Sequence, residues 1–326
     1  MPTRLLSDLQ TLRQNASEAE TGYYERLLAL RYRQAYDILE AQLGKLYAQM
    51  GDNPSLQEAR RYGRLDKLRK AIAAEYKSLT TKNIEITRQS SASSYADAYY
   101  GSAWAYDQAV GVELSWPTLS VEAIRASVWS SATGENFSDR LKHWETREII
   151  QLQQKITQGL ALGYGYPKVA RNVKQEVADD FSRIIRIVRT EAHRNYSQGH
   201  LELYNQLDAV GVQARKRWEA TLDTRTRDTH GSLDGKYADD DGLFWIHGAS
   251  AEAPGLFGVA EEDINCRCRV IEVIDGYEPE LRRIRGEGIQ PYRTFKDWAS
   301  ERGWSESKGW AIEAKTRVAL EQTMGY

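Results

Sequence analysis

The stretch Pro167–Ala192, which reads PKVARNVKQEVADDFSRIIRIVRTEA, decides the fold class. Its apolar residues recur every three or four positions, as one face of an α-helix requires. They are Val169, Val173, Val177, Phe181, Ile185, Val188 and Ala192. Pro167 suits the first turn of a helix, because its ring fixes φ near the helical value. The stretch therefore predicts a long amphipathic helix and indicates a mainly α protein.

Similar spacing extends over most of residues 1–200. Proline, which interrupts helices, occurs there only at Pro2, Pro54, Pro117 and Pro167. We predict further helices over residues 5–49, 55–78, 80–110, 120–129 and 138–162.

Composition excludes several classes of protein. The 326 residues are 41% hydrophobic and 28% charged, which is typical of a soluble globular protein. The formal net charge of −2 argues against a protein that coats DNA, so any nucleic-acid contact is expected to be local. We find neither a signal peptide nor a membrane-spanning stretch. The two cysteines are too few for a disulfide scaffold, and they favour a reducing compartment.

The character of the sequence changes near residue 210. Residues 215–275 hold 8 Lys and Arg against 13 Asp and Glu, and strand-like runs occupy residues 216–221 and 268–274. Helical segments return over 294–301 and 305–323. We therefore predict a mainly α fold with a small α+β C-terminal domain, in which an elongated multi-helix body precedes a short β-sheet and terminal helices. We divide the chain into four predicted segments. Residues 1–118 form a helical segment that binds a partner, and residues 119–210 form a second helical segment. Residues 211–275 form the small α+β domain, and residues 276–326 form a helical tail.

The stretch Trp218–Gly235, WEATLDTRTRDTHGSLDG, is the densest in polar motifs. Asp223 is placed to pair with Arg225, and Asp234-Gly235 favours a hairpin turn because glycine tolerates positive φ. One interpretation is a salt-bridged turn that holds a small domain together. The alternative places Arg225, Arg227 and His230 around an anionic substrate or a metal.

Asn265-Cys266-Arg267-Cys268 forms a second motif. In an extended strand both thiols face the same side, so with His230 they supply three ligands for tetrahedral Zn²⁺. Asp263 and His247 are candidates for the fourth ligand. The alternative is that the cysteines are small buried apolar residues. A nucleophilic role has less support, because nothing local activates either thiol.

Two groups on the predicted helices have both structural and binding interpretations. Arg189 and Glu191 either support the helix surface or reach the second domain. The aromatic residues of the 80–110 helix either belong to the core or anchor a partner protein. The partner-binding candidates among them are Tyr95, Tyr99, Tyr100 and Trp104.

The order and spacing of these motifs resemble the phage Mu F-like minor head proteins, also called head-morphogenesis proteins. The resemblance covers roughly residues 120–275 and includes a turn at 134–140. It is carried by Arg189-Thr190-Glu191, the 216–235 block and Ile264-Asn265-Cys266-Arg267-Cys268. Many relatives have Cys at positions 227 and 230 and His-Pro before the Asn-Cys-Arg-Cys. This chain has Arg227, His230 and Asp263-Ile264, which leaves His230, Cys266, Cys268 and Asp263 as metal ligands.

The resemblance implies a minor capsid protein of a tailed phage or prophage. Such a protein is present in few copies, binds the portal inside the procapsid, and assists head assembly and DNA packaging or ejection. Its implied partners are the portal, the major capsid or scaffold protein, and packaged DNA through local basic segments, with no membrane. It is implied to lie in the virion at the portal vertex, and in host cytoplasm during assembly. No catalytic residue is assigned.

Two alternatives differ in kind. One is an enzyme that acts on a nucleotide or a peptide bond through Arg225, His230 and a carboxylate, Glu191 or Asp234. The other is a metal-stabilised DNA-contacting module. Its candidate residues are Arg267, Arg269, Arg282, Arg283 and Arg285, of which the last three otherwise form a solvated helix end.

Overall fold

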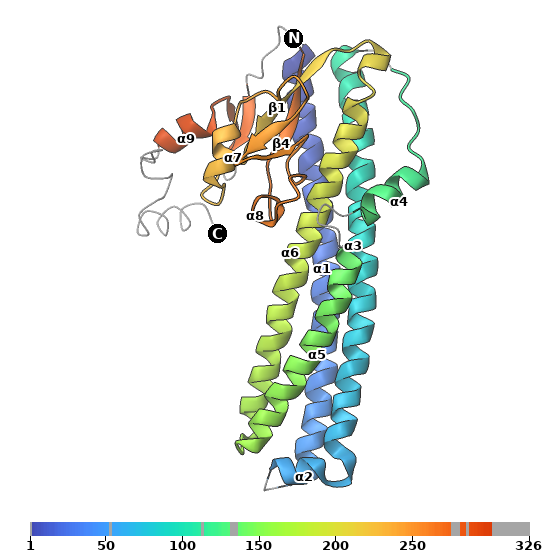
Figure 1. Cartoon of the computed structure of the whole chain (residues 1–326), viewed down its shortest axis with the longest axis vertical. Helices are drawn as coiled ribbons and strands as arrows, with labels where there is room; N and C mark the ends of the chain where they lie inside the picture. Colours follow the sequence, from blue (N-terminus) through green and yellow to red (C-terminus); the bar gives the residue numbers. More distant parts are fainter. Residues whose placement is uncertain are drawn as a thin grey trace. The chain divides into compact units, whose positions relative to one another are not determined.

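The computed structural model describes residues 2–51, 54–111, 114–130, 136–274, 281–284 and 287–301, and it is mainly α-helical (Figure 1). The long helices are α1 (Pro2–Met50), α3 (Arg64–Val110), α5 (Phe137–Ala161) and α6 (Tyr166–Tyr204). The short ones are α2 (Leu56–Arg60), α4 (Val121–Trp129), α7 (Asp228–Leu233), α8 (Ala260–Asp263) and α9 (Phe295–Glu301). The predicted fold class is confirmed.

Local chemistry explains most helix ends. Gly51 follows α1 with a φ of 66°, which is the left-handed conformation that favours glycine. Asn136 caps α5, where its side chain accepts a hydrogen bond from the backbone N–H of Asp139 at 3.0 Å. The predicted amphipathic stretch lies within α6, and its Val169, Val173 and Val188 are buried as expected.

Two predicted helix boundaries are wrong. Residues 64–110 form one continuous helix, because the residues around position 80 include no glycine or proline to interrupt it. Instead, the break lies at Tyr62 and Gly63, whose φ values of 54° and 66° separate α2 from α3. The predicted 294–301 helix is confirmed as α9, whereas the 305–323 helix lies outside the described residues.

The strands form antiparallel pairs. β1 (Ala214–Glu219) pairs with β4 (Arg269–Ile274), with Trp218 opposite Val270. β2 (Phe244–Ile246) pairs with β3 (Ala249–Ala251), and β5 (Leu281–Ile284) pairs with β6 (Gly288–Pro291). Trp218 is fully buried and contacts Phe244 and Phe257, so it lies at the centre of the core beside β1.

The chain divides into two compact units that are not contiguous in sequence. The first unit combines residues 1–19, 91–128 and 192–326, and it contains all the described strands. The second unit combines residues 20–90 and 129–191 and is a helical bundle. Helices α1, α3 and α6 therefore contribute residues to both units. The predicted boundaries at 118, 210 and 275 follow a different, linear division of the chain.

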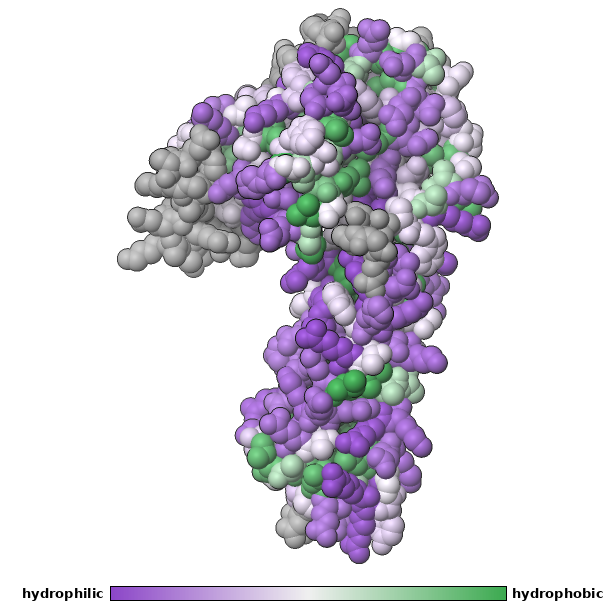
Figure 2. Space-filling model, viewed as in Figure 1, coloured by the Kyte–Doolittle hydropathy of each residue, from purple (hydrophilic) through white to green (hydrophobic). Residues whose placement is uncertain are grey.

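The visible face of the molecule is largely hydrophilic, with apolar side chains in scattered groups (Figure 2). Across the described part of the chain, no helix has both the length and the apolar character that a bilayer crossing requires.

Candidate functional site

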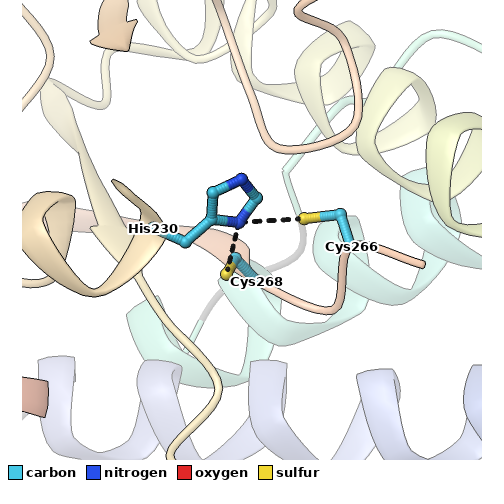
Figure 3. A group of neighbouring side chains, drawn as sticks. All are labelled: His230, Cys266 and Cys268. Atoms are coloured by element: carbon cyan, nitrogen blue, oxygen red, sulfur yellow. Dashed lines mark hydrogen bonds between the residues drawn. The ribbon is translucent and has the colours of Figure 1, made fainter. Parts of the chain in front are cut away.

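His230, Cys266 and Cys268 converge in the first unit (Figure 3). His230 lies on α7, and both cysteines lie in the segment between α8 and β4. The Nδ1 atom of His230 lies 3.3 Å from Cys268 Sγ and 3.6 Å from Cys266 Sγ. All three side chains are buried, and their candidate ligand atoms lie within 4.8 Å of one another. The structure thus brings together three of the four residues predicted to bind a metal.

The histidine ring is fixed from both sides. It forms a T-shaped contact with the Trp218 ring at a centroid distance of 5.4 Å. Its Nε2 atom lies 3.0 Å from an Oε2 oxygen of Glu262, and the same oxygen accepts a hydrogen bond from the Thr229 hydroxyl at 2.9 Å. Sequence reasoning missed Glu262, because its role depends on the packing of α8 against α7.

The two thiols have different electrostatic environments. Burial raises the pKa of Cys266 well above its ordinary value, and its side-chain contacts with Cys268 act in the same direction. Burial also opposes ionisation of Cys268, but hydrogen bonds from the Cys266 thiol and His230 lower the pKa of Cys268. Cys268 is therefore the thiol that ionises first.

Asp263 and His247 do not join this group. The Asp263 carboxylate accepts hydrogen bonds from the backbone N–H groups of Phe257 and Gly258, at 3.0 and 2.7 Å. Proximity in sequence to Cys266 made Asp263 look like a ligand, but this carboxylate caps a loop instead. His247 is exposed in the turn between β2 and β3, with a φ of 47°.

Asp223 is the centre of a neighbouring ion pair. Both terminal nitrogens of the Arg267 guanidinium donate hydrogen bonds to its buried carboxylate. The carboxylate also accepts a hydrogen bond from the backbone N–H of Arg225 at 2.9 Å. Burial alone would raise the pKa of Asp223, but these contacts hold it below its ordinary value. Arg227 donates to the backbone oxygen of Ile264 at 2.5 Å, so it ties α7 to the cysteine segment.

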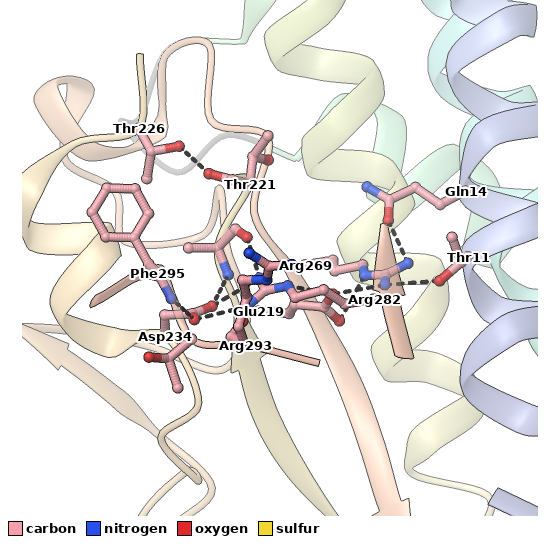
Figure 4. Close-up of polar contacts among 12 residues, drawn as sticks. Thr11, Gln14, Glu219, Thr221, Thr226, Asp234, Arg269, Arg282, Arg293 and Phe295 are labelled. Atoms are coloured by element: carbon pink, nitrogen blue, oxygen red, sulfur yellow. Dashed lines mark hydrogen bonds and ion pairs between the residues drawn. The ribbon is translucent and has the colours of Figure 1, made fainter. Parts of the chain in front are cut away.

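Arg282 links several segments through a second buried network (Figure 4). Its guanidinium pairs with Asp234 at 2.9 Å and donates to the backbone oxygen of Ala220 at 2.5 Å. Arg269 pairs with Glu219, and the pKa of Glu219 stays low despite burial because Arg269 and Arg282 lie beside it. The prediction of a solvated helix end is wrong for Arg282: it lies in strand β5 and is 2% exposed. Arg285 is outside the described residues.

The predicted turn at Asp234-Gly235 forms, but it does not make a hairpin. Gly235 has a φ of 77° and donates its N–H to the Trp218 backbone oxygen at 2.9 Å. The turn follows α7 rather than a strand, and it leads to Tyr237, which bridges Arg217 of β1. The Asp234 carboxylate also accepts the N–H of Ala220 at 2.7 Å.

The two charged residues predicted on α6 pair within the helical unit. Arg189 binds Glu25 at 2.5 and 2.8 Å, and the buried Glu191 pairs with Arg140 at 2.5 Å. Glu191 thus belongs to a different unit from Arg225 and His230. The other proposed carboxylate, Asp234, lies in the same unit as Arg225 and His230, but it pairs with Arg282.

The aromatic residues of α3 divide between two faces of the helix. Tyr95 and Tyr99 are buried, so the prediction that they contact a partner is wrong for these two. Tyr100 and Trp104 are 46% and 44% exposed, because each residue of a helix is rotated by about 100° from the one before it. With Leu12 and Arg13 of α1, they line a groove of about 420 Å³.

A buried polar chain in the first unit was not predicted. His200 Nδ1 lies 3.0 Å from the Ser102 hydroxyl, and its Nε2 pairs with Glu272. Glu272 also accepts a hydrogen bond from Gln10. These contacts join α1, α3, α6 and β4, and no local motif announces them because the partners are far apart in sequence.

Comparison with known proteins identifies the family. A family model described as "Phage Mu protein F like protein" matches residues 150–271. The chain is also 30% identical over 275 residues to Minor head protein GP7 of Bacillus phage SPP1, across 81% of this chain and 88% of that protein. This chain belongs to the phage Mu F-like family. This membership confirms the resemblance drawn from the motifs and supports a role in phage head morphogenesis.

A second relative carries a different name. The chain is 32% identical over 296 residues to NAD(+)–arginine ADP-ribosyltransferase EFV of Enterococcus faecalis (strain ATCC 700802 / V583). The match covers 90% of this chain but only 60% of that protein. No solved structure matches this Mu F-like chain significantly.

Proposed function

We propose that this chain binds the portal in few copies at the inside of the procapsid and assists head assembly and DNA packaging or ejection. The observation that carries the proposal is the match to a minor head protein over 88% of that protein's length. The proposed location is the portal vertex of the virion, reached from the host cytoplasm during assembly. Contacts with the major capsid or scaffold protein belong to the same proposal.

The proposed portal contact includes the groove formed by Leu12, Arg13, Tyr100, Gly101 and Trp104. Half-exposed aromatic side chains are the type that anchors protein interfaces, since they bury a large area with little loss of side-chain entropy. The groove also contains a cation, since Arg13 lines it together with the two aromatic side chains. Arg13 forms an ion pair with Asp97.

The experiment is co-purification with the portal protein encoded beside this chain. We expect the wild-type chain to be retained on the tagged portal and the Tyr100→Ala/Trp104→Ala variant to be lost, with unchanged thermal unfolding. Tyr23→Ala, which removes an aromatic residue of similar exposure on α1 in the helical unit, is the matched control. Failure of the wild-type chain to bind the portal contradicts the proposal.

Within this proposal the role is architectural, and the chain has no reaction of its own. Three of the arginines that are candidates for DNA contact lie in internal pairs: Arg267 with Asp223, Arg269 with Glu219 and Arg282 with Asp234. Release of nicotinamide from NAD⁺ by the purified chain, abolished by His230→Ala in a folded variant, would overturn this part.

A further inference from the structure

The His230, Cys266 and Cys268 side chains have the spacing of a metal site. Zinc binds sulfur at about 2.3 Å and imidazole nitrogen at about 2.0 Å, so tetrahedral geometry separates N and S ligands by about 3.5 Å. The two N···S distances here are 3.3 and 3.6 Å. Both N···S distances therefore match those around one zinc ion, and all three candidate ligand atoms lie within 4.8 Å of one another.

Hydrogen bonds from the Cys266 thiol and from His230 to Cys268 explain part of this convergence, but they leave the second short N···S contact unexplained. The Nδ1 atom of a histidine carries either one proton or one lone pair, so it makes one good hydrogen bond. Here both sulfurs face the same Nδ1 atom in a buried site. A cation between the three atoms would satisfy all of them at once.

The surroundings of His230 also fit a metal ligand. Metal-binding histidines usually direct their second ring nitrogen at a carboxylate, which fixes the ring orientation and the tautomer. The Nε2 atom of His230 lies 3.0 Å from Glu262, and Thr229 holds that carboxylate oxygen by a hydrogen bond. This arrangement leaves Nδ1 as the nitrogen that faces the two sulfurs.

We propose that His230 Nδ1, Cys266 Sγ and Cys268 Sγ bind one Zn²⁺ ion that serves as a structural clip. The ion joins α7 to the segment that leads into β4, next to Trp218, which contacts the His230 ring. Binding displaces one proton from each thiol, and the two thiolates balance the charge of the ion. This role is independent of any contact with the portal.

The fourth coordination position is left to a water molecule or another small ligand. Among the residues that the structure describes, no further histidine, cysteine or carboxylate joins the group. Asp263 is the nearest candidate in sequence, but its two oxygens already accept backbone N–H groups.

The test measures metal in the full-length chain, purified without chelators. We expect about one zinc per chain by elemental mass spectrometry, in line with a single structural site. After zinc is replaced by cobalt, we expect the absorption band of thiolate-to-cobalt charge transfer. Cys268→Ser should lose both signals, whereas His247→Ala, which removes an exposed histidine, should keep both.

A second variant tests the site even if Cys268→Ser loses zinc only because it fails to fold. Glu262→Gln keeps all three ligands but weakens the support of His230, so we expect full occupancy with an affinity lowered about 10-fold. Zinc below about a tenth of an equivalent, with no cobalt band in the folded chain, would overturn the proposal. A Cys266–Cys268 disulfide in freshly purified protein, seen as a mass lower by two hydrogens, would also overturn it.

Discussion

Two buried acids beside the sheet of the first unit differ from Asp180 of the helical second unit in the partners that surround them. Around the sheet, the carboxylates of Glu219 and Asp223 are paired with arginines, and their pKa values are low. In the helical unit, Asp180 accepts a hydrogen bond from the Tyr32 hydroxyl at 2.8 Å. Burial raises the pKa of Asp180 to about 6. The arginines beside Glu219 and Asp223 outweigh the effect of burial, whereas the Tyr32 hydrogen bond and Arg183 lower the pKa of Asp180 by less than burial and Glu148 raise it.

The largest expected effect comes from removing a carboxylate from the sheet network. Asp234→Ala removes the bidentate partner of the buried Arg282 and the carboxylate that accepts hydrogen bonds from the N–H groups of Ala220 and Phe295. We expect a loss of about 3–5 kcal/mol in the free energy of unfolding of the first unit. Amide hydrogen exchange should rise in residues 214–301 and change little in the helical unit.

The exposed Asp240 provides the control, since Asp240→Ala removes a charge that is in contact with solvent. An equal loss in both variants would show that the Arg282 network is no more important than a surface charge.

Close helix packing in the first unit gives the next effect. A Cβ added at Gly199 of α6 would lie 2.1 Å from the backbone oxygen of Tyr95 in α3. Because a backbone atom cannot rotate away, we expect Gly199→Ala to cost about 3 kcal/mol. Thermal unfolding followed by circular dichroism measures this change, and a variant as stable as the wild type would mean that these helices separate easily.

The pH response should distinguish the two regions. The pKa of Asp180 is raised in the folded state, so its contribution to stability is present below about pH 4 and is lost as pH rises through about 6. Between pH 7 and pH 5 the helical unit should gain about 1 kcal/mol, as measured by hydrogen exchange. Glu219 and Asp223, whose pKa values are lowered, destabilise the sheet only at still lower pH.

Asp180→Asn mimics the neutral acid and should remove this gain while the sheet responds as before. A gain that persists in the variant would assign the effect to another group.

The smallest effect should be a stabilisation of the helical unit. A Cβ at Gly44 of α1 would meet Tyr166 at an ordinary contact distance of 3.8 Å. Since alanine restricts the unfolded chain more than glycine does, Gly44→Ala should add about 0.5–1 kcal/mol to the stability of that unit. Thermal unfolding followed by circular dichroism, as for Gly199→Ala, measures this change, and a loss of stability in Gly44→Ala would indicate tighter packing than the 3.8 Å contact implies.

The sequence predicted the helices and strands well because their signals are local. Periodicity identified α6, and the runs at 216–221 and 268–274 correspond to β1 and β4. The break at Tyr62 was missed because a tyrosine with positive φ has no sequence signature.

The candidate site was predictable only in part. Ligand chemistry selected His230, Cys266 and Cys268, which do converge. Ligand chemistry also selected Asp263, but its carboxylate accepts hydrogen bonds from two backbone N–H groups of a loop and is not part of the cluster. Arg282 was placed at a solvated helix end because its neighbours are charged, and only tertiary structure reveals its buried partners.

The Gln10–Glu272 hydrogen bond bears on the order of synthesis. Arg269 likewise donates to Thr11 at 2.8 Å, so β4 is fastened to the opening turns of α1. These two segments are more than 250 residues apart in the sequence. The first turns of α1 are therefore synthesised long before the strand that they contact, and these contacts form only after β4 has been made. A nascent chain stalled before residue 269 should therefore leave its earliest helical turns open to proteases, even when the helical bundle has already formed.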